Sequence, residues 1–513
     1  MALLYLGEQI ARLPFVPYNI FDWMARVLPG NLIKIVVNAI VSVISLLNLG
    51  STSESAKTIE QLIALVQFVV LGAVFGGIVS WLMARNKQNG RSNSLVAGFV
   101  LFVLASLIVS QVVSIWLLDV IWLGVVLIGW SWVLAKILGW EPSADMDGVS
   151  NVARRDVVIK LVGGSIGLAI GAWGFGRLFG KGSGPTGASE PLADQGGDNT
   201  PVVGSSVDSE TAAALENRIT PAPGTRPELT SNENFYRIDI NTRPPVINQE
   251  NWALMVDGLF DNPRPLSLAD IMAYPSVTQP VTMGCISNRV GGDLIGTTNW
   301  TGPRLRDVLA DLGIQDGATH LLVEAVDGFY ETVSMMDMVD DRTLLVYGMN
   351  GETLPIEHGF PLRIYIPDRY GMKQPKWINH ISAAAEDMDG YWVVRGWSKE
   401  ARPQIVSVID AVDANQKSAE GFIPIGGIAW AGGRGIQKVE LQFDNGEWVE
   451  AVLRTPELSP LTWTQWRYDW MAESGSHLIK VRATDGTGAL QIEDERGTAP
   501  SGATGYHSKR VRV

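Results

Sequence analysis

Five long apolar stretches in the first 180 residues constrain the fold of this chain more than any other feature. They run over residues 32–49, 62–84, 95–113, 117–138 and 158–179. Each contains, or nearly contains, the roughly 20 apolar residues that an α-helix needs to cross a bilayer. The pattern predicts an α-helical transmembrane domain of four or five helices over residues 1–180. The count stays open because the third and fourth stretches nearly touch at Asp119, and the first alternatively lies along the membrane surface.

The basic residues beside these stretches predict how the helices are oriented. Lysine and arginine are enriched in cytoplasmic loops, and here they occupy every second loop. Five helices with a cytoplasmic N-terminus therefore predict a multi-pass protein of the plasma membrane, with its C-terminal half on the extracytoplasmic, or periplasmic, side. Arg154 and Arg155 also resemble a twin-arginine export signal. Alternatively, these two arginines only follow the positive-inside rule. The basic residues are Arg12, Arg26, Arg85, Lys87, Arg91, Lys136, Arg154 and Arg155.

Charge and composition exclude several classes of protein. The formal net charge of −13 argues against a nucleic-acid partner, because nucleic-acid binding requires a basic surface. Cys285 is the single cysteine, so the chain forms no intrachain disulfide and holds neither a CxxCH haem nor a cysteine-ligated iron–sulfur cluster. None of the five histidines lies in an apolar stretch, so a haem between two helix histidines is not expected. The helices are then either a plain anchor or a docking site for a quinone or a partner.

The composition changes abruptly after residue 180. Residues 181–230 are rich in Gly, Pro, Ser and acidic residues and have no hydrophobic period, so they predict a flexible linker. Residues 231–402 mix strand patterns with the helix pattern WTGPRLRDVLADLG, which predicts an α+β domain with a helix closed by Gly313. Residues 403–513 are all β in pattern, with a hairpin signal at Asp444-Asn445-Gly446, and they predict a β-sandwich of the immunoglobulin type.

The single cysteine stands in the polar, glycine-rich stretch VTMGCISNRVGGDLIG, residues 281–296. Three interpretations remain open from composition alone. A buried structural thiol usually lies within an apolar run, and Cys285 does not. A catalytic nucleophile needs a nearby base, which the sequence neither supplies nor excludes. A metal-bound thiolate fits polar, backbone-rich surroundings that stabilise the anion and admit a cofactor.

From about Asn232 to Val513 the chain resembles the sulfite oxidase family of molybdenum-cofactor enzymes, in a membrane-anchored bacterial form. Similar blocks follow one another in order: NENFYRIDI, WALMVDG, GCISNRVGGDLIG with NWTGPRLRDVLADLG, VEAVDGFYETVS, YGMNGETLPIEHGFPLRIYIPDRYGMKQPKWINHI and GIAWAGGRGIQKVELQFDNGEWVEA. The resemblance implies a sulfite-oxidase-type molybdopterin domain over residues 231–402. It also implies a dimerisation-type, immunoglobulin-like domain over residues 403–513. Whether the chain is a monomer or a dimer stays open.

The resemblance also implies a cofactor and the residues that hold it. Molybdenum bound by the dithiolene of molybdopterin takes one protein thiolate, which makes Cys285 the metal ligand and a catalytic residue, and soft sulfur suits that role. Arg289 and Arg237 match positions of catalytic arginines. The pterin ends in a phosphate, which calls for Arg, Lys and backbone donors. The implied cofactor-binding residues are Asn234, Phe235, Tyr236, Arg237, Asp327, His358, Arg363, Lys373 and Lys376.

Two positions depart from the pattern of sulfite oxidases. Those enzymes carry two adjacent arginines after C-x-x-N, whereas this chain has Arg289 followed by Val290. The family's active-site tyrosine matches Met388, with Tyr391 three residues later. Both departures argue against sulfite as the substrate, and they leave the expected cofactor site intact.

The expected function is that of a membrane-anchored, extracytoplasmic molybdenum oxidoreductase. It carries out a two-electron change or oxygen-atom transfer on a small sulfur-containing or related substrate. Because the chain lacks haem and cluster ligands, electrons are exchanged with a separate partner, a cytochrome or a quinone-linked protein. The other expected partners are the lipid bilayer and the small-molecule substrate. Two alternatives remain: a reductase of an S-oxide or N-oxide, such as methionine sulfoxide, fed by membrane quinol, or a non-catalytic module that binds the cofactor.

Overall fold

The computed structural model describes residues 1–47, 49–85, 90–113, 115–138, 215 and, apart from residues 416 and 419, residues 217–513. The predicted fifth apolar helix, the Arg154–Arg155 pair and most of the predicted linker lie outside the described residues. The chain divides into two units. The first comprises Met1–Ile40, Ser55–Ala188 and Ile240–Arg243, and the second comprises Val41–Glu54, Ser189–Asp239 and Pro244–Val513.

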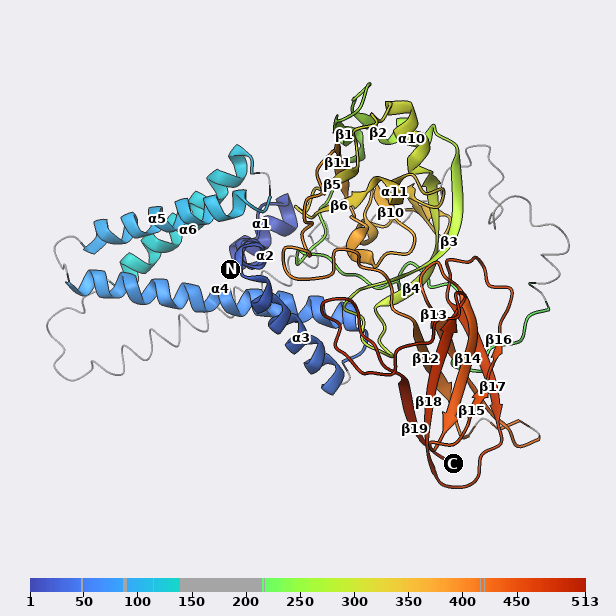
Figure 1. Ribbon diagram of the computed structural model, residues 1–513. Helices are drawn as coiled ribbons and strands as arrows, with labels where there is room; N and C mark the ends of the chain where they lie inside the picture. Colours follow the sequence, from blue (N-terminus) through green and yellow to red (C-terminus); the bar gives the residue numbers. More distant parts are fainter. Residues whose placement is uncertain are drawn as a thin grey trace, which may run out of the picture. The chain divides into compact units, whose positions relative to one another are not determined.

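The N-terminal region is helical, as its apolar stretches predict (Figure 1). Two short helices that the sequence analysis did not predict precede the apolar ones. Pro17 stands at the start of the second, where its missing N–H breaks no helical hydrogen bond. Leu4, Phe15, Val109 and Leu123 belong to the core that these helices share. The helices are α1 (Ala2–Ala11), α2 (Val16–Val27), α3 (Gly30–Leu47), α4 (Thr52–Arg85), α5 (Gly90–Ser110) and α6 (Leu117–Leu138).

One helix among the described residues is long and apolar enough to cross a membrane, namely Thr52–Ile78 within α4. Only 6% of its most apolar stretch is buried, so it is not the core helix of a globular bundle. The apolar parts of the other three, Leu32–Ile44, Leu95–Ser110 and Leu117–Val133, are shorter. At 1.5 Å per residue, Leu95–Ser110 spans about 24 Å of the roughly 30 Å hydrocarbon core. The predicted bundle of four or five spanning helices is therefore not shown.

The four residues Ile240–Arg243 belong to the helical unit although their sequence neighbours belong to the second unit. The Asp22 carboxylate of α2 accepts the Thr242 backbone N–H at 2.9 Å and the Thr242 hydroxyl at 3.3 Å. The Lys57 ammonium of α4 donates to the Asn241 carbonyl at 3.0 Å. These buried bonds fix the backbone of the short segment within the helical unit.

The second unit contains a five-stranded mixed sheet in the order β2-β1-β11-β5-β6. Strand β1 pairs with β11 in parallel, and the other pairs are antiparallel. Leu305, Val308, Leu309 and Leu312 form the apolar face of α10 and bury into the same core as this sheet. Gly313 closes α10 in the left-handed conformation, which confirms the predicted helix end. The elements are β1 (Ala253–Gly258), β2 (Leu266–Ser267), α9 (Leu268–Met272), α10 (Leu305–Leu312), β5 (His320–Ala325), β6 (Tyr330–Ser334), α11 (Met335–Met338) and β11 (Ile378–Ala384).

A second sheet, in the order β3-β4-β8-β9, carries the cysteine loop. Strands β3 and β4 pair antiparallel along their full length, and Gly284 opposite Ile295 is the last pair before the loop. A two-stranded ribbon of β7 and β10 completes this part. The elements are β3 (Ser276–Gly284), β4 (Ile295–Pro303), β7 (Leu344–Val346), β8 (Gly348–Met349), β9 (Glu352–Thr353), the 3-10 turns η1 (Gln249–Asn251), η2 (Ile356–His358) and η3 (Gly371–Lys373), and β10 (Arg363–Tyr365).

The C-terminal part consists of two four-stranded antiparallel sheets, β12-β13-β17-β16 and β15-β14-β18-β19 (Figure 1). Both sheets contribute to one apolar core, so the predicted sandwich is present, while its assignment to the immunoglobulin type stays an interpretation. Asp444 and Asn445 have positive φ between β14 and β15, which confirms the predicted hairpin. The strands are β12 (Val406–Val412), β13 (Ile423–Trp430), β14 (Ile436–Phe443), β15 (Trp448–Glu450), β16 (Val452–Leu453), β17 (Thr464–Trp470), β18 (Ser476–Asp485) and β19 (His507–Arg512).

The described end of the predicted linker is not a free tether. Arg226 forms an ion pair with Asp410 of β12 at 2.6 Å, and Arg218 pairs with Glu228 at 2.5 Å. The Thr230 N–H donates to the Thr297 carbonyl of β4 at 2.6 Å. Residues 217–230 thus contain groups bonded within the segment and groups bonded to β4 and β12, while the bounds of the linker stay a prediction.

Candidate functional site

Cys285 is the first residue after β3, at the start of the loop that returns the chain to β4. Its backbone N–H donates to the Leu294 carbonyl at 2.9 Å, which closes the loop. Its thiol lies 3.0 Å from the Ser287 hydroxyl. The residue is 8% exposed. Burial raises the pKa of the thiol, and the hydrogen bond to Ser287 partly opposes that rise. A thiolate here is therefore best stabilised by a cation bound to the sulfur itself.

An aromatic wall lies in the same buried cluster as Cys285. The ring of Phe235 stacks on Tyr236 with 5.2 Å between centroids, and it meets the rings of Trp300 and His358 edge-on at 5.8 Å and 5.5 Å. Burial raises the pKa of Tyr236 well above its usual value, so its hydroxyl stays protonated and able to donate. A Cβ added at Gly371 would lie 3.1 Å from that hydroxyl, so glycine keeps the space beside Tyr236 open.

Arg363 of β10 is a buried cation, only 3% exposed. Its guanidinium donates to the His358 carbonyl at 3.0 Å, approaches the Met283 sulfur at 3.5 Å and lies 4.7 Å above the Trp300 ring. Its Nε has no hydrogen-bond partner, and no carboxylate pairs with it among the described residues. Burial lowers its pKa to about 10, so the group stays charged at neutral pH. A buried arginine without a carboxylate partner is well suited to bind a ligand anion, to which its N–H groups donate.

His358 of η2 is neutral. Burial, with smaller contributions from the Lys376 and Arg363 cations, lowers its pKa to about 3. Its Nε2 lies 3.1 Å from the Asn232 carbonyl oxygen. Because a carbonyl only accepts, Nε2 carries the proton and Nδ1 is left as an acceptor. His358 can therefore hydrogen-bond to a donor on a ligand without adding charge.

Asp239 organises two of the predicted cofactor cations, although the sequence analysis did not single it out. Its fully buried carboxylate pairs with Arg237 at 2.7 Å and Lys376 at 3.4 Å. Lys376 also donates to the Glu357 carbonyl at 3.0 Å. Burial lowers the pKa of Lys376 to about 8, although the Asp239 carboxylate opposes this. The i, i+2 spacing of Arg237 and Asp239 in an extended segment was the sequence signal that both side chains share one face.

The remaining predicted cofactor residues have protein partners. Lys373 forms a buried ion pair with Glu331 at 2.7 Å. Asp327 is buried and accepts the Phe329 backbone N–H at 3.0 Å. Asn234 is exposed and donates to the Ser231 hydroxyl at 2.9 Å. Cofactor contacts of Lys373, Asp327 and Asn234 therefore stay predictions.

The structure places the predicted catalytic arginine after Cys285 outside the buried group. The Arg289 side chain is exposed and donates to the Ser42 hydroxyl at 3.1 Å. Val290 is half-buried. Met388 is 43% exposed, whereas Tyr391 is buried. The side chain that the tyrosine match selects is therefore a surface methionine, and a substrate-binding role for Arg289 stays a prediction.

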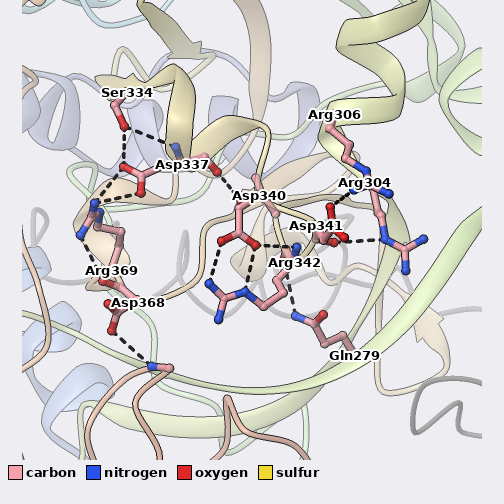
Figure 2. A network of polar contacts seen from close by, with 12 residues as sticks. Gln279, Arg304, Arg306, Ser334, Asp337, Asp340, Asp341, Arg342, Asp368 and Arg369 are labelled. Atoms are coloured by element: carbon pink, nitrogen blue, oxygen red, sulfur yellow. Dashed lines mark hydrogen bonds and ion pairs between the residues drawn. The ribbon is translucent and has the colours of Figure 1, made fainter. Parts of the chain in front are cut away.

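Figure 2 shows a polar network around Asp337 and Arg369. Arg369 lies two residues before Gly371. The Arg369 guanidinium donates to both carboxylate oxygens of Asp337 at 2.9 Å. Asp337 in turn accepts the Ser334 hydroxyl at 2.9 Å. The carboxylate of Asp368, the residue before Arg369, accepts a hydrogen bond from the Arg402 guanidinium at 2.9 Å. These bonds hold residues 368–373 in place between β10 and β11, and so determine where Gly371 and Lys373 lie.

The chain matches known proteins over this region. Residues 241–392 match the family described as the oxidoreductase molybdopterin binding domain. A sulfite oxidase of Arabidopsis thaliana is 32% identical over 274 residues, which are 44% of this chain and 70% of that protein. The chain belongs to the sulfite oxidase family of molybdopterin-dependent oxidoreductases. The family match confirms that it is an enzyme of this class.

Two further relatives belong to the same group of oxidoreductases. The uncharacterized oxidoreductase YuiH of Bacillus subtilis (strain 168) is 32% identical over 152 residues, 30% of this chain and 75% of that protein. The mitochondrial sulfite oxidase of Drosophila melanogaster is 27% identical over 344 residues, 55% of this chain and 59% of that protein. These matches assign neither the substrate nor the location of this sulfite oxidase family member.

The site residues fit the cofactor that the family implies, Mo-molybdopterin. Among the described residues, no three His, Cys, Asp or Glu side chains are grouped to hold a metal ion. In the described part of the chain, Cys285 would therefore be the protein ligand of the metal, and the pterin dithiolene would supply further sulfur ligands. Arg363, with its unpartnered Nε, suits an anionic group, and Arg237 and Lys376 provide two further cations. Thiol, aromatic wall and cations thus meet the chemical needs of a phosphate-bearing pterin.

Proposed function

We propose that this enzyme performs a two-electron change or oxygen-atom transfer on a small sulfur-containing substrate, with molybdenum bound through Cys285. The observation that carries the proposal is the buried Arg363, which lacks a carboxylate partner in the described part of the chain. It contacts Met283 and Trp300, which belong to the core cluster of the single thiol. Such a cation is costly to bury unless an anion accompanies it. The bound cofactor supplies the redox step, and the chain binds and orients it.

The substrate we propose carries less negative charge than sulfite. Two of the relatives are named sulfite oxidases, which supports a small sulfur compound as the substrate class. In this chain, however, Val290 stands where the resemblance to sulfite oxidases implies a second arginine, and Arg289 is directed to Ser42. A site with fewer arginines binds a doubly charged oxyanion less well. A thioether, a sulfoxide or a related neutral sulfur compound fits these side chains better.

We propose that electrons pass to or from a separate partner, either a cytochrome or a quinone-linked membrane protein. The chain has one cysteine, which the metal occupies, so it lacks the ligands for an iron–sulfur relay of its own.

We propose further that the enzyme is anchored in the plasma membrane with its catalytic domain on the extracytoplasmic side. Helix α4 supports an anchor, because large apolar side chains such as Leu62, Val66 and Val70 are exposed along it. The shorter apolar helices support a multi-pass arrangement only together with the sequence patterns of residues 1–180. The Arg154–Arg155 pair supports export of a folded, cofactor-loaded domain.

The test is one preparation of full-length protein, extracted in detergent and analysed for molybdenum and pterin. The same sample is assayed for sulfite oxidation, thioether oxidation and sulfoxide reduction with artificial electron carriers. We expect bound molybdenum and turnover of a neutral sulfur substrate in preference to sulfite. Reduction of sulfoxide alone would instead identify the alternative, an S-oxide reductase. Bound cofactor without any turnover would leave a non-catalytic cofactor-binding module.

A further inference from the structure

A buried ion pair of Lys373 and Glu331 lies in the molybdopterin domain. The Lys373 ammonium of η3 donates to Oε1 of Glu331 in β6 at 2.7 Å, and both side chains are almost completely buried. The Thr332 backbone N–H donates to the same oxygen at 3.0 Å. The other oxygen, Oε2, is buried without a hydrogen-bond partner among the described residues. A buried carboxylate oxygen without a donor is where a proton or a water molecule is favoured.

The inner end of this pair adjoins the cofactor site. Lys373 is the last residue of η3, and Gly371 is the first. A Cβ at Gly371 would lie 3.1 Å from the Tyr236 hydroxyl and 3.6 Å from the carbonyl oxygen of Gly284, the residue before Cys285. One three-residue turn thus touches the metal-ligand loop at one end and positions the Lys373 ammonium at the other.

The outer end of the pair reaches a cluster of charged groups at the surface. A Cβ at Gly390 would overlap the Glu331 carboxylate, so the backbone of Gly390 covers it directly. The adjacent Asp389 is exposed and pairs with Lys399 at 2.8 Å. Lys399 also pairs with Asp387 at 2.9 Å. The Glu331 carboxylate is therefore covered by the residue that directly follows the solvent-exposed Asp389.

The proposed reaction requires such a connection. When a substrate gains an oxygen atom that comes from water, each turnover releases two protons and two electrons, and the electrons leave to the separate carrier. Protons released in a buried site need titratable groups that lead outward. This inference rests on the proposed function: we propose that Glu331, positioned by Lys373, carries protons between the cofactor site and the protein surface beside Asp387 and Asp389.

The charges around Glu331 suit this role. Burial raises its pKa, while the facing cations, Lys373 of η3 and Lys399 of the covering loop, lower it. The net result is a raised pKa. At neutral pH the protonated and ionised forms of Glu331 are therefore closer in free energy than those of an exposed glutamate. Lys373, which the family resemblance assigns to the cofactor, acts here as a positioning residue for Glu331.

The test compares Glu331→Gln with Glu386→Gln, which removes an exposed charge from the same covering loop. Glutamine keeps the size and the hydrogen bond to Lys373 but does not titrate. We expect Glu331→Gln to keep molybdenum and pterin while kcat falls on the order of a hundredfold with little change in KM. The solvent deuterium isotope effect on kcat increases as well. Glu386→Gln behaves like the parent. Equal kcat and equal pH profiles for parent and Glu331→Gln would overturn the inference.

Two further measurements separate this inference from the proposed function and from a purely structural role. In Glu331→Ala, formate restores turnover and formamide of similar size does not, because only formate can take up and release a proton. Difference infrared spectra of the full-length protein, recorded as purified and without substrate, show a titrating carboxyl band that Glu331→Gln lacks. If the parent shows no turnover but the infrared band is present, the proposed function is wrong, whereas the inference that the Glu331 carboxyl takes up and releases protons is retained. If the parent lacks that infrared band, Glu331 is not a proton carrier, whatever the activity of the enzyme.

Discussion

At the scale of single residues, the site combines one thiol with cations that respond differently to pH. Arg363 stays charged at neutral pH even though burial lowers its pKa to about 10. Lys376 has a pKa of about 8, and His358, with a pKa of about 3, is neutral. The positive charge that faces a bound phosphate therefore depends on pH only through the lysine in the range where proteins are usually studied.

Cys285→Ser separates metal binding from pterin binding. A serine hydroxyl is a poor replacement for a soft thiolate, so we expect loss of turnover and a changed molybdenum spectrum. The pterin stays bound, because Arg237, Arg363 and Lys376 are unchanged. The measurements are turnover, electron paramagnetic resonance and pterin fluorescence after release. Ser287→Ala, which removes only the hydroxyl beside the sulfur, serves as the control. Parent-like turnover of Cys285→Ser would contradict its assignment as the metal ligand.

The lowered pKa of Lys376 leads us to expect that pterin retention changes with pH. As pH rises through about 8, Lys376 loses its proton, and a phosphate loses one charge-assisted contact. We expect roughly tenfold weaker retention above that pH, since such a contact is worth about 1.5 kcal/mol or more. A bound phosphate moves the transition upward. Lys376→Arg removes the transition because arginine stays charged. Pterin content after gel filtration over a pH series measures this, and an unchanged transition in Lys376→Arg would exclude Lys376 as its cause.

At the scale of elements, the helices of the first unit hold a short extended segment through a buried acid. Asp22 accepts two hydrogen bonds from Thr242. Burial raises the pKa of Asp22 from 3.8 to about 7, although the hydrogen bond and nearby Lys57 and Arg26 oppose it. Because the folded-state pKa exceeds the unfolded value, the stabilisation is complete below about pH 4 and is lost as pH rises through about 7.

Asp22→Asn tests this buried contact. The amide keeps an acceptor for the Thr242 N–H but does not titrate. The parent helical unit should lose stability between about pH 4 and about pH 7, with a slope of up to about 1.4 kcal/mol per pH unit, and Asp22→Asn should not. Thermal unfolding of the full chain in detergent at several pH values measures the difference. Glu54→Gln, at an exposed acid in the first turn of α4, is the control. The same pH slope in Asp22→Asn and the parent would show that Asp22 is not responsible.

At the scale of the whole molecule, the proposed anchor and export route depend on residues 1–180. Arg154→Lys with Arg155→Lys keeps the positive charge and so leaves helix orientation undisturbed. If the pair directs export of the folded domain, the C-terminal half of the variant stays in the cytoplasm while α4 still inserts. Protease accessibility in spheroplasts measures this, with a Lys136→Arg variant as the control. Normal export of the double-lysine protein would leave the pair as a topology signal alone.

Much of the fold and part of the site could be predicted from local sequence patterns. The apolar face of α10 and its end at Gly313 follow from a helical period and a left-handed glycine, which depend on neighbours within four residues. The hairpin at Asp444 and Asn445 follows from turn preferences of two residues. Cys285 was identified because it is the single cysteine within a family motif. Each of these signals is complete within one short stretch of the chain.

The partners of the charged side chains were decided only by the tertiary structure. Lys373 meets Glu331 across 42 residues, and Lys376 meets Asp239 across 137. Asp22 meets Thr242 across 220. Nothing in the spacing of these residues selects the partners, because strand register and turn packing bring them together. By itself the sequence determined the apolar helices among the described residues, the helix that ends at Gly313 and the hairpin at Asp444 and Asn445, and that one thiol is available to a metal. Only the packed chain determined which cations are neutralised and which, like Arg363, are left for a ligand, because the cost of a buried charge depends on what lies within a few ångströms of it.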